Sequence, residues 1–373
     1  MRDLSTELYE HQEVADMLHG KYGTREIRFK YLLLDKNEQP KFELLEVESG
    51  SVEMQAFADI KRTAKFRIRD NESIDWLSDR IQPFVEIKMS DKNVSNWISY
   101  PLGVFVLSTP KRVEINDQVY RDVDAYDGLV ILKEDKFTER YTVTVGMKYT
   151  DAMVQILQSA GITKYNIEDS NKVLPADKDW KIGTEKIRGV NDLAAAINHT
   201  PFWVDEYGYY TCTGYTSPSD KPIDYEYANN EISVTYNGME EELDLFSVPN
   251  SFTLVLSDTE REPLIASKEN NNLDSPTSIP NRGRQIVDYR EVQDVADQET
   301  LDAKVNRIAN NASQIYGHVE FETAIMPFHS YQDVIQIRNS TLGIDGKYAE
   351  TAWSFDLEVG STMKHAVRKV VEI

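Results

Sequence analysis

The sequence is poor in cysteine, because its 373 residues include only Cys212. A single cysteine excludes an intramolecular disulfide framework and a zinc cluster built on cysteine, and it fits synthesis in a reducing compartment. Long apolar runs are also lacking, since no window approaches the roughly 18 consecutive apolar residues of a membrane-spanning helix. Residues 1–7 carry acids where a signal peptide needs an apolar run. We therefore expect neither conventional export nor a stable membrane association.

Positive charge is scarce as well. Lysine and arginine number 41 against 63 aspartates and glutamates, which gives a formal net charge of −22. Such a chain repels phosphate backbones and anionic lipid headgroups, so a protein that reads a DNA or RNA sequence is disfavoured. Hydrophobic residues at 40% and charged residues at 28% are nevertheless ordinary for a folded protein. At about 150 residues per domain, the length predicts two or three domains.

Catalytic and metal-binding motifs are missing too. No HExxH, GxSxG, P-loop or GxGxxG pattern occurs, and the six histidines show no pair at zinc-ligand spacing on one helix. His318 and Glu320 share one face of an expected strand, but such pairs commonly belong to a solvated polar surface. The Asn/Asp cluster at 269–274 lacks the glycine and the terminal glutamate of an EF-hand. We therefore predict no catalytic residue, no metal site and no cofactor, and we expect that the chain is not an enzyme.

The N-terminal segment 1–25 is predicted to be a helical arm. Gly20 and Gly23 end an apolar pattern whose members fall near one helical face: Leu4, Leu8, Val14, Ala15 and Leu18. Two placements stay open for this amphipathic helix, one against its own chain and one against a neighbouring chain.

From Ile27 onward the apolar period changes from 3.6 to 2, and residues 26–147 are predicted to be rich in β-strands. The alternating runs are Ile27/Phe29/Tyr31/Leu33, Phe66/Ile68, Val85/Ile87/Met89, Val104/Val106, Val119/Val123/Ala125 and Tyr141/Val143/Val145. Many short strands separated by polar turns indicate a sandwich or a barrel rather than a parallel sheet.

Residues 148–230 are predicted to form a small α/β module. One helix is indicated by the spacing of Met153, Ile156, Leu157 and Ala160, and a second by Val190, Leu193, Ala194 and Ile197. Two short strands, at 202–204 and 209–212, follow the second helix and flank a polar turn.

Strands return in residues 231–373, together with one long helix and one long loop. The helix, at 297–316, has Asp297 as its N-cap, and the polar loop spans 257–283. The expected strands are Ile232/Val234/Tyr236, Phe252–Leu256, Val319/Phe321/Thr323/Ile325, Trp353/Phe355/Leu357/Val359 and Ala366–Val371.

Tyrosine is concentrated in one short region. Six tyrosines lie close together in the sequence: Tyr207, Tyr209, Tyr210, Tyr215, Tyr225 and Tyr227. Each offers apolar area together with a hydroxyl group, which suits an interface or a surface on which sugars stack. Because β-hairpins are rich in tyrosine anyway, a purely structural role stays open for each of them.

Several strings along the chain resemble a known family. They are Ile74–Pro83, Trp97–Phe105, Leu243–Asn250, Ser275–Ser278, Asn281–Arg284, Leu342–Tyr348 and Met363–Val370, together with the helix-then-strand unit at 297–326. In combination they resemble the tail hub (baseplate hub or tail-tip) proteins of tailed bacteriophages and, more distantly, the hubs of contractile injection systems. The likeness covers nearly the whole chain after about the first 25 residues.

This resemblance implies a mainly β (α+β) fold, with two tandem antiparallel β-barrels of tail-tube type, at 26–147 and 231–373, and the small α/β module between them. It implies a homotrimeric ring that imitates the six-fold tail tube, adapts it to a three-fold tip or spike, and lets DNA pass. The implied partners are the distal tail or tail-tube protein, the tape-measure protein, and tip, spike or receptor-binding proteins. The implied location is the virion, after synthesis in the host cytoplasm. Longer hubs carry a C-terminal hydrolase or spike, which we do not expect after Ile373.

Within such a ring, the contacts to neighbours are predicted at Leu4, Leu8, Leu18, Asn270, Asn271, Asp274, Tyr209 and Tyr210. The net negative charge would lower adhesion of passing DNA if acids line the bore. The alternative function is a β-rich protein that binds or cleaves carbohydrate on host cell-surface glycans, with the tyrosines as its stacking surface.

Overall fold

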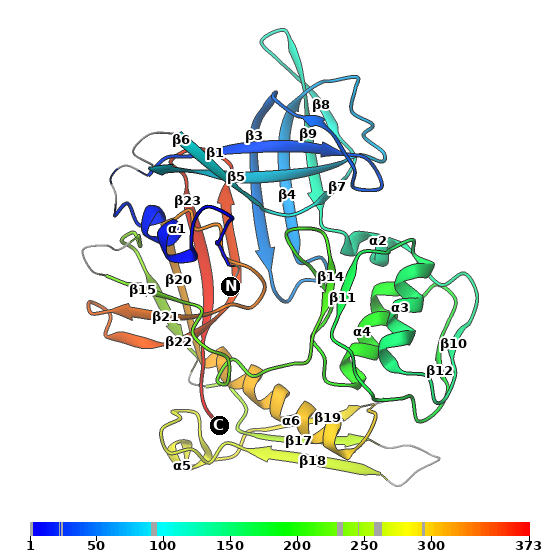
Figure 1. Ribbon diagram of the computed structural model, residues 1–373. Coiled ribbons are helices and arrows are strands. Elements are labelled where there is room, and N and C mark those ends of the chain that lie inside the picture. The colour runs from blue at the N-terminus through cyan, green and yellow to red at the C-terminus, as the bar shows by residue number, and fades with distance from the viewer. Residues whose placement is uncertain are drawn as a thin grey trace.

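The computed structural model describes residues 3–21, 23, 25–90, 95–229, 234–244, 246–256, 263–292 and 295–373 (Figure 1). Its described strands are joined into one large sheet and three small ones. No helix among these residues is both long enough and apolar enough to cross a membrane.

The N-terminal β-half follows a short helical arm. Its strands are β1 (Ile27–Leu34), β2 (Pro40–Glu43), β3 (Val47–Gln55), β4 (Arg62–Arg69), β5 (Arg80–Ser90), β6 (Ser95–Pro101), β7 (Phe105–Leu107), β8 (Lys111–Ile115) and β9 (Gln118–Tyr126). The clearest alternation is in β4, where Phe66 and Ile68 are buried whereas Lys65 and Arg69 are exposed. The alternation with a period of two therefore predicts β4 correctly.

The arm differs from the expected helix. The helix α1 (His11–Leu18) covers only its second part, and an irregular segment precedes it. Leu4 and Leu18 are buried in the core of the N-terminal β-half, and the Tyr100 hydroxyl donates a hydrogen bond to the Leu4 carbonyl over 2.6 Å. Two placements were left open for the N-terminal helix, and in the described chain the arm packs against its own chain.

The α/β module has its own hydrophobic core, which runs from Leu129 to Cys212. Its elements are α2 (Leu129–Glu134), β10 (Tyr141–Val143), α3 (Tyr149–Ser159), β11 (Tyr165–Ile167), β12 (Lys178–Trp180), α4 (Lys186–Ala196), β13 (Trp203–Val204) and β14 (Tyr210–Cys212). Both expected helices are confirmed. The core begins earlier than the expected boundary at residue 148, because α2 and β10 pack with the module.

The C-terminal half contains the rest of the large sheet. Its strands are β15 (Tyr225–Ala228), β16 (Glu240–Leu243), β20 (Gly317–Ala324), β21 (Val334–Asn339), β22 (Ile344–Asp356) and β23 (Thr362–Lys369). The strand expected around Ile232 falls partly outside the described residues, and Thr235 forms only an isolated bridge to Thr323. β15 pairs in parallel with β21, so this half includes residues that we expected in the module.

A smaller layer is inserted between β16 and β20. It consists of β17 (Ser251–Leu256), β18 (Leu264–Glu269), α5 (Ile279–Arg282), β19 (Val287–Val292), α6 (Gln298–Ser313) and the 3-10 turn Gln314–Tyr316. α6 begins as expected, because the Asp297 carboxylate accepts a hydrogen bond from the Thr300 N–H over 2.7 Å. The loop expected at 257–283 is corrected: beyond residues 257–262, which are outside the described chain, it contains β18 and α5.

The two β-halves are not separate barrels in the described chain. β22 pairs with β3, from Ala352 opposite Gln55 to Asp356 opposite Ser51, and this pairing joins both halves into one 15-stranded sheet. The mainly β, largely antiparallel fold is confirmed. Among the described residues no pairing closes either half into a barrel; instead, the first half continues into the second through hydrogen bonds.

Candidate functional site

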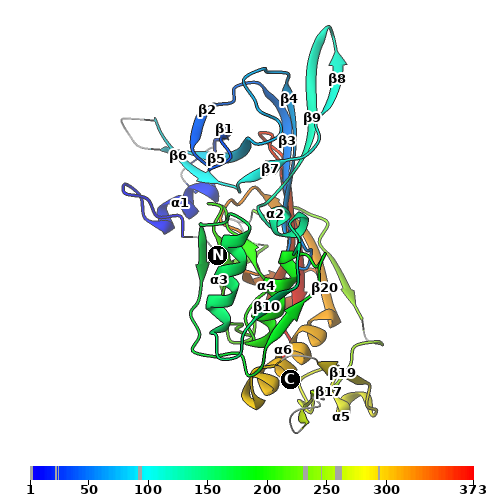
Figure 2. The same cartoon turned by 90° about the vertical axis from the view of Figure 1, so that its right-hand side faces the viewer.

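A long run of antiparallel strands crosses the whole molecule. In the described chain it comprises eight strands in the order β16-β20-β23-β22-β3-β4-β9-β8. We call it the ribbon. In Figure 2 the module with α3 and α4 lies on one side of β3 and β4, and none of the helices in the described part of the chain lies on the other side of these two strands. The ribbon thus has one covered face and one face that is open to solvent.

Alternation along the strands decides which side chains lie on each face. Trp353 and Phe355 are buried on the covered face, whereas Ser354 and Asp356 point the other way and are at least partly exposed. The middle of the open face is small and polar, with Ser51, Ala352 and Ala366 on neighbouring strands.

The open face carries charges of both signs. Its acids are Glu53, Asp122, Asp124, Glu240, Glu242, Glu320, Glu322 and Asp356, and its bases are Lys65, Arg67, Arg69, Lys111, Lys364 and Arg368. Arg67 and Asp122 form an ion pair across β4 and β9 over 2.6 Å. The overall charge of −22 is therefore not concentrated on this face, and only its β16–β20 end is mainly acidic.

The ribbon ends in two edges that differ in charge. β16 presents Glu240, Glu241 and Glu242, which are all exposed. β8 presents two bases, Lys111 and Arg112, and one acid, Glu114, which are all exposed on a hairpin that rises above the rest of the molecule in Figure 1. Each edge strand is paired on one side in the described chain, so each leaves a row of backbone donors and acceptors on the other side.

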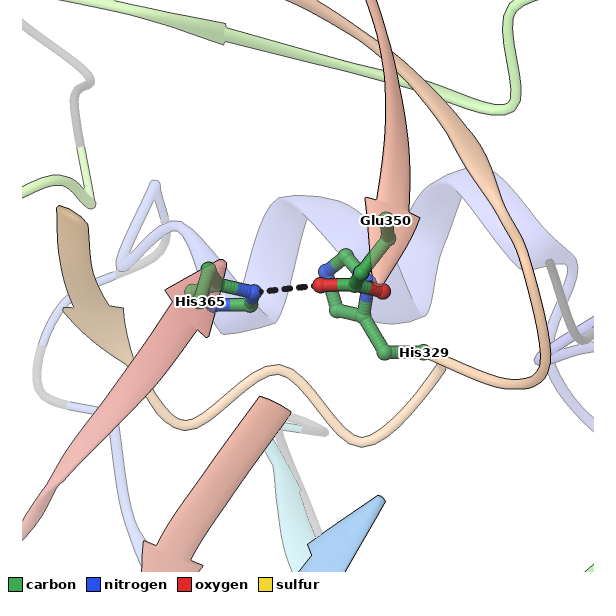
Figure 3. Close-up of side chains that lie close together, drawn as sticks. All are labelled: His329, Glu350 and His365. Carbon is green, nitrogen blue, oxygen red and sulfur yellow. Dashed lines mark hydrogen bonds and ion pairs between the residues drawn. The ribbon is translucent and has the colours of Figure 1, made fainter. Parts of the chain in front are cut away.

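A buried cluster of ionisable groups lies beneath the ribbon, where β22 meets β23. Figure 3 shows the Glu350 carboxylate between the imidazoles of His329 and His365. Glu350 belongs to β22, His365 belongs to β23, and His329 comes from the segment between β20 and β21. All three side chains are at most 1% exposed.

Both imidazoles donate to the same carboxylate. His329 Nδ1 is 2.7 Å from Glu350 Oε2, and His365 Nδ1 is 2.7 Å from Glu350 Oε1. The outer ring nitrogens also have partners, since His329 Nε2 lies 2.6 Å from the Tyr227 hydroxyl and His365 Nε2 lies 2.9 Å from the Thr323 hydroxyl. The three ionisable groups thus meet the rule that buried polar groups are hydrogen-bonded.

The carboxylate between the two imidazoles affects their pKa values differently. Burial by itself disfavours charge, but His329 and the two hydrogen bonds hold the pKa of Glu350 at about 2. The negative charge of Glu350 in turn outweighs burial and raises the pKa of His329. Burial lowers the pKa of His365, and the charge of His329 acts in the same direction. One carboxylate can compensate only one of the two rings.

These three residues are also the donor set that a transition metal would use. Two ligands of one tetrahedral zinc ion stand roughly 3.4 Å apart, given bonds of about 2.1 Å. The nitrogen–oxygen distances of 2.7 Å are shorter and match charge-assisted hydrogen bonds. The geometry is that of an ion-pair network between strands.

Comparison with known proteins identifies the fold. The tail protein of Neisseria meningitidis MC58 aligns with a TM-score of 0.65 at 10% identity, over 92% of this chain and 97% of that one. The 43 kDa tail protein of prophage MuSo2 from Shewanella oneidensis aligns with a TM-score of 0.60 at 10% identity, over 91% and 98%. The chain has the fold of phage tail proteins.

A component of a secretion system is also similar in fold to this chain. The E. coli c3393 protein, described as a component of the type VI secretion system with structural similarity to the T4 tail proteins gp27 and gp5, aligns with a TM-score of 0.50 at 9% identity, over 88% of this chain and 74% of that one. No family model and no curated protein sequence matches the chain. The resemblance to tail hubs, and more distantly to injection-system hubs, is confirmed as a likeness of fold.

The residues that we expected at contacts with neighbouring copies differ in their exposure. Leu4 and Leu18 are buried in the chain's own core, whereas Leu8 is 74% exposed. Asn270 is fully buried and donates to the Ser275 hydroxyl over 2.8 Å, whereas Asn271 and Asp274 are exposed. As contacts in a ring they all stay predictions, with Leu8, Asn271 and Asp274 accessible in the described chain.

The tyrosines do not form one surface. Tyr210 is buried and donates to the Gly128 carbonyl over 2.5 Å, while Tyr209 is 42% exposed and lies beneath the Lys164 ammonium. Tyr227 is buried beside His329. The group that looked contiguous in sequence is thus divided between the module core, its surface and the C-terminal half. This removes the common stacking surface on which the carbohydrate alternative rested.

Sequence reasoning missed the His329–Glu350–His365 cluster. The close spacing of His318 and Glu320 suggested a pair on a solvated strand face, and the structure joins these two side chains over 3.0 Å. The members of the buried cluster are 21 and 15 positions apart in the chain. The available signal was weak: His365 is two residues from Met363 and from Val367, which are apolar and share its face of β23, but the expected strand began only at Ala366.

Proposed function

We propose that this chain is a structural tail protein that forms a hub at the distal end of a phage tail tube. Three copies form a ring that adapts the six-fold tube to a three-fold tip or spike and lets DNA pass. Its partners are the tail-tube, tape-measure and tip or receptor-binding proteins, and its location is the virion. The tail-protein fold supports the class of function.

The observation that carries the ring is the ribbon with its two open edges. A head-to-tail contact needs two different faces that fit each other, and β8 offers basic residues whereas β16 offers acidic ones. Antiparallel edge strands pair readily when both have free backbone groups. Joining β8 of one copy to β16 of the next would continue the ribbon around the ring, in the way that β22 and β3 continue it within the chain.

The ribbon has a suitable width for this role. Three copies of eight strands make about 24 strands, and at about 4.8 Å between strands the circumference is roughly 115 Å. The corresponding diameter of about 37 Å leaves room for duplex DNA once side chains are allowed for. The open face, with its small central residues and mixed charges, would then line the bore.

Light scattering and electron microscopy on the purified chain test this proposal. We expect a mass near three times the 42.8 kDa of one chain, in rings with a central opening. The edge pairing is tested by charge reversal: Lys111→Glu with Arg112→Glu should disrupt the ring, as should Glu240→Lys with Glu242→Lys. The variant that carries both reversals should restore it.

A matched control is Glu139→Lys, which changes an exposed acid of the module and should leave the ring intact. Circular dichroism shows whether each variant is folded. A monomer at every concentration, with edge variants that behave like the wild type, would contradict the ring.

A further inference from the structure

The joint between the two β-halves lies along β22, which changes its pairing partner part-way along its length. Ile344–Ala349 pair with β21, within the C-terminal half, and Ala352–Asp356 pair with β3, in the N-terminal half. The register of β22 shifts between Glu350 and Ala352, as at a β-bulge. Glu350 therefore occupies the point at which β22 leaves one partner for the other.

The side chain of Glu350 ties this point to its surroundings. Its backbone N–H donates to the Asp333 carbonyl over 2.8 Å, and its carboxylate accepts from His329 and His365. His365 stands directly opposite Trp353, the second residue of β22 that pairs with β3. A change in the cluster is therefore transmitted to the joint through residues in direct contact.

We propose that the His329–Glu350–His365 cluster is an acid-labile latch: when His365 takes up a proton, the pairing of β22 with β3 loosens while the α/β module stays folded. This inference rests on the chain alone and does not require the proposed ring.

A second positive charge in the cluster is electrostatically unfavourable. The rings of His329 and His365 have centroids 4.7 Å apart, and Glu350 already compensates the charge of His329. The rings around them are aromatic and buried: Phe321 stacks on His365 at 4.7 Å, and Tyr227 stacks on His329 at 5.9 Å. Such an environment does not replace the solvation that a second imidazolium loses.

Charged and titratable groups face the cluster from several elements. Asp333, directly before β21, has its Oδ2 3.8 Å from His329 Nδ1, and Tyr227 approaches from β15. Arg25 donates a hydrogen bond to the Ile325 carbonyl. Arg62 and Glu206 form an ion pair that lines a small void beside His329. Burial raises the pKa of Asp333, so protonation of this carboxyl in acid favours the folded state and opposes the effect of His365. A variant at Asp333 separates the effect of protonating this carboxyl from the effect of protonating His365.

The sign of the effect follows from linkage. Because the pKa of His365 is lowered in the folded chain, the unfolded joint binds more protons, and stability falls as the pH drops below the ordinary histidine value of about 6.5. The pKa of Glu350, held at about 2, adds a further loss only below its ordinary value of 4.5. The latch is therefore expected to act at mildly acid pH.

Hydrogen exchange measured by mass spectrometry tests the latch. Wild-type protein is labelled at pH 7 and at pH 5, with labelling times scaled to the chemical exchange rate at each pH. Peptides from β3 and from the second part of β22 should exchange faster at pH 5, by up to about tenfold per pH unit for one proton taken up. Peptides from α3 and α4 serve as the internal reference and should not change.

Three variants identify the group that titrates. His365→Gln keeps a polar side chain between Glu350 and Thr323 but cannot take up the proton, so its joint should show no acid-dependent exchange. Asp333→Asn should enlarge the acid effect. His318→Gln, which removes a partly exposed histidine paired with Glu320, should behave like the wild type.

A cross-strand disulfide provides a test that does not depend on altering the cluster. Glu53 and Ser354 stand opposite each other in the joint, so Glu53→Cys with Ser354→Cys should lock it, and reduction should restore the acid effect. The latch is overturned if the wild-type joint is equally protected at both pH values, or if His365→Gln responds to acid as the wild type does.

Discussion

Two histidine–glutamate pairs of this molecule have different surroundings, which give them different roles. His318 and Glu320 are two residues apart on β20, 3.0 Å from each other, and 34% and 64% exposed. His329, from the segment between β20 and β21, and Glu350, on β22, lie 2.7 Å apart and are at most 1% exposed. The chemistry is the same, but water screens the first pair and is excluded from the second.

Burial therefore decides how much such a pair contributes to the free energy of unfolding. An exposed ion pair typically contributes less than about 1 kcal/mol, because solvent competes for both partners. A buried partner left without its counter-charge costs several times more. The fold places the buried pair, whose disruption costs more unfolding free energy, at the joint between the two halves. The exposed pair lies on the open face of the ribbon.

The largest effect is expected from Glu350→Ala. This change leaves two buried imidazoles without the carboxylate that holds them, and a broken buried pair costs about 3–5 kcal/mol. Urea unfolding followed by circular dichroism measures the loss of unfolding free energy. A loss below about 1 kcal/mol would show that the cluster does not hold the joint.

A smaller effect is expected from Tyr227→Phe. The ring, which packs against Phe321 and His365, stays in place, but the hydroxyl 2.6 Å from His329 Nε2 is lost. Leaving one buried polar group without its partner costs about 1–3 kcal/mol. The same urea titration measures this loss of unfolding free energy. A loss equal to that of Glu350→Ala would mean that the carboxylate contributes no more to stability than the Tyr227 hydroxyl does.

The smallest effect is expected from His318→Ala on the open face. Since Glu320 is exposed and the imidazole is partly exposed, the unfolding free energy should change by no more than about 0.5 kcal/mol. Thermal unfolding at low and at high salt checks this. A loss comparable to that of Tyr227→Phe would end the contrast between the two pairs.

Local sequence patterns were sufficient to predict most of the individual helices and strands. The alternation of Phe66 and Ile68, the spacing of Met153, Ile156 and Leu157, and the cap at Asp297 all depend on neighbours in the chain, and all three elements are present. The strand β18 was missed because its polar residues Ser267, Lys268 and Glu269 give it the composition of a loop. It forms because β17 supplies the backbone partners.

The candidate site could be predicted only in part. The edge strands β8 and β16 carry their charges in contiguous sequence, but that they end one ribbon follows only from the pairing of β22 with β3. The contact residues expected on the arm illustrate the same limit, since the apolar pattern predicts that Leu4 and Leu18 are buried without saying against which surface.

By itself the sequence determined the class of fold, the helices of the module, the acidic charge and the absence of known catalytic motifs, because each depends on composition or on residues a few positions apart. The tertiary structure decided the continuity of the sheet, the open face and the meeting of His329, Glu350 and His365. These depend on pairing between segments as far apart as β3 and β22, and that pairing is chosen by the packing of the whole core, which no local pattern contains.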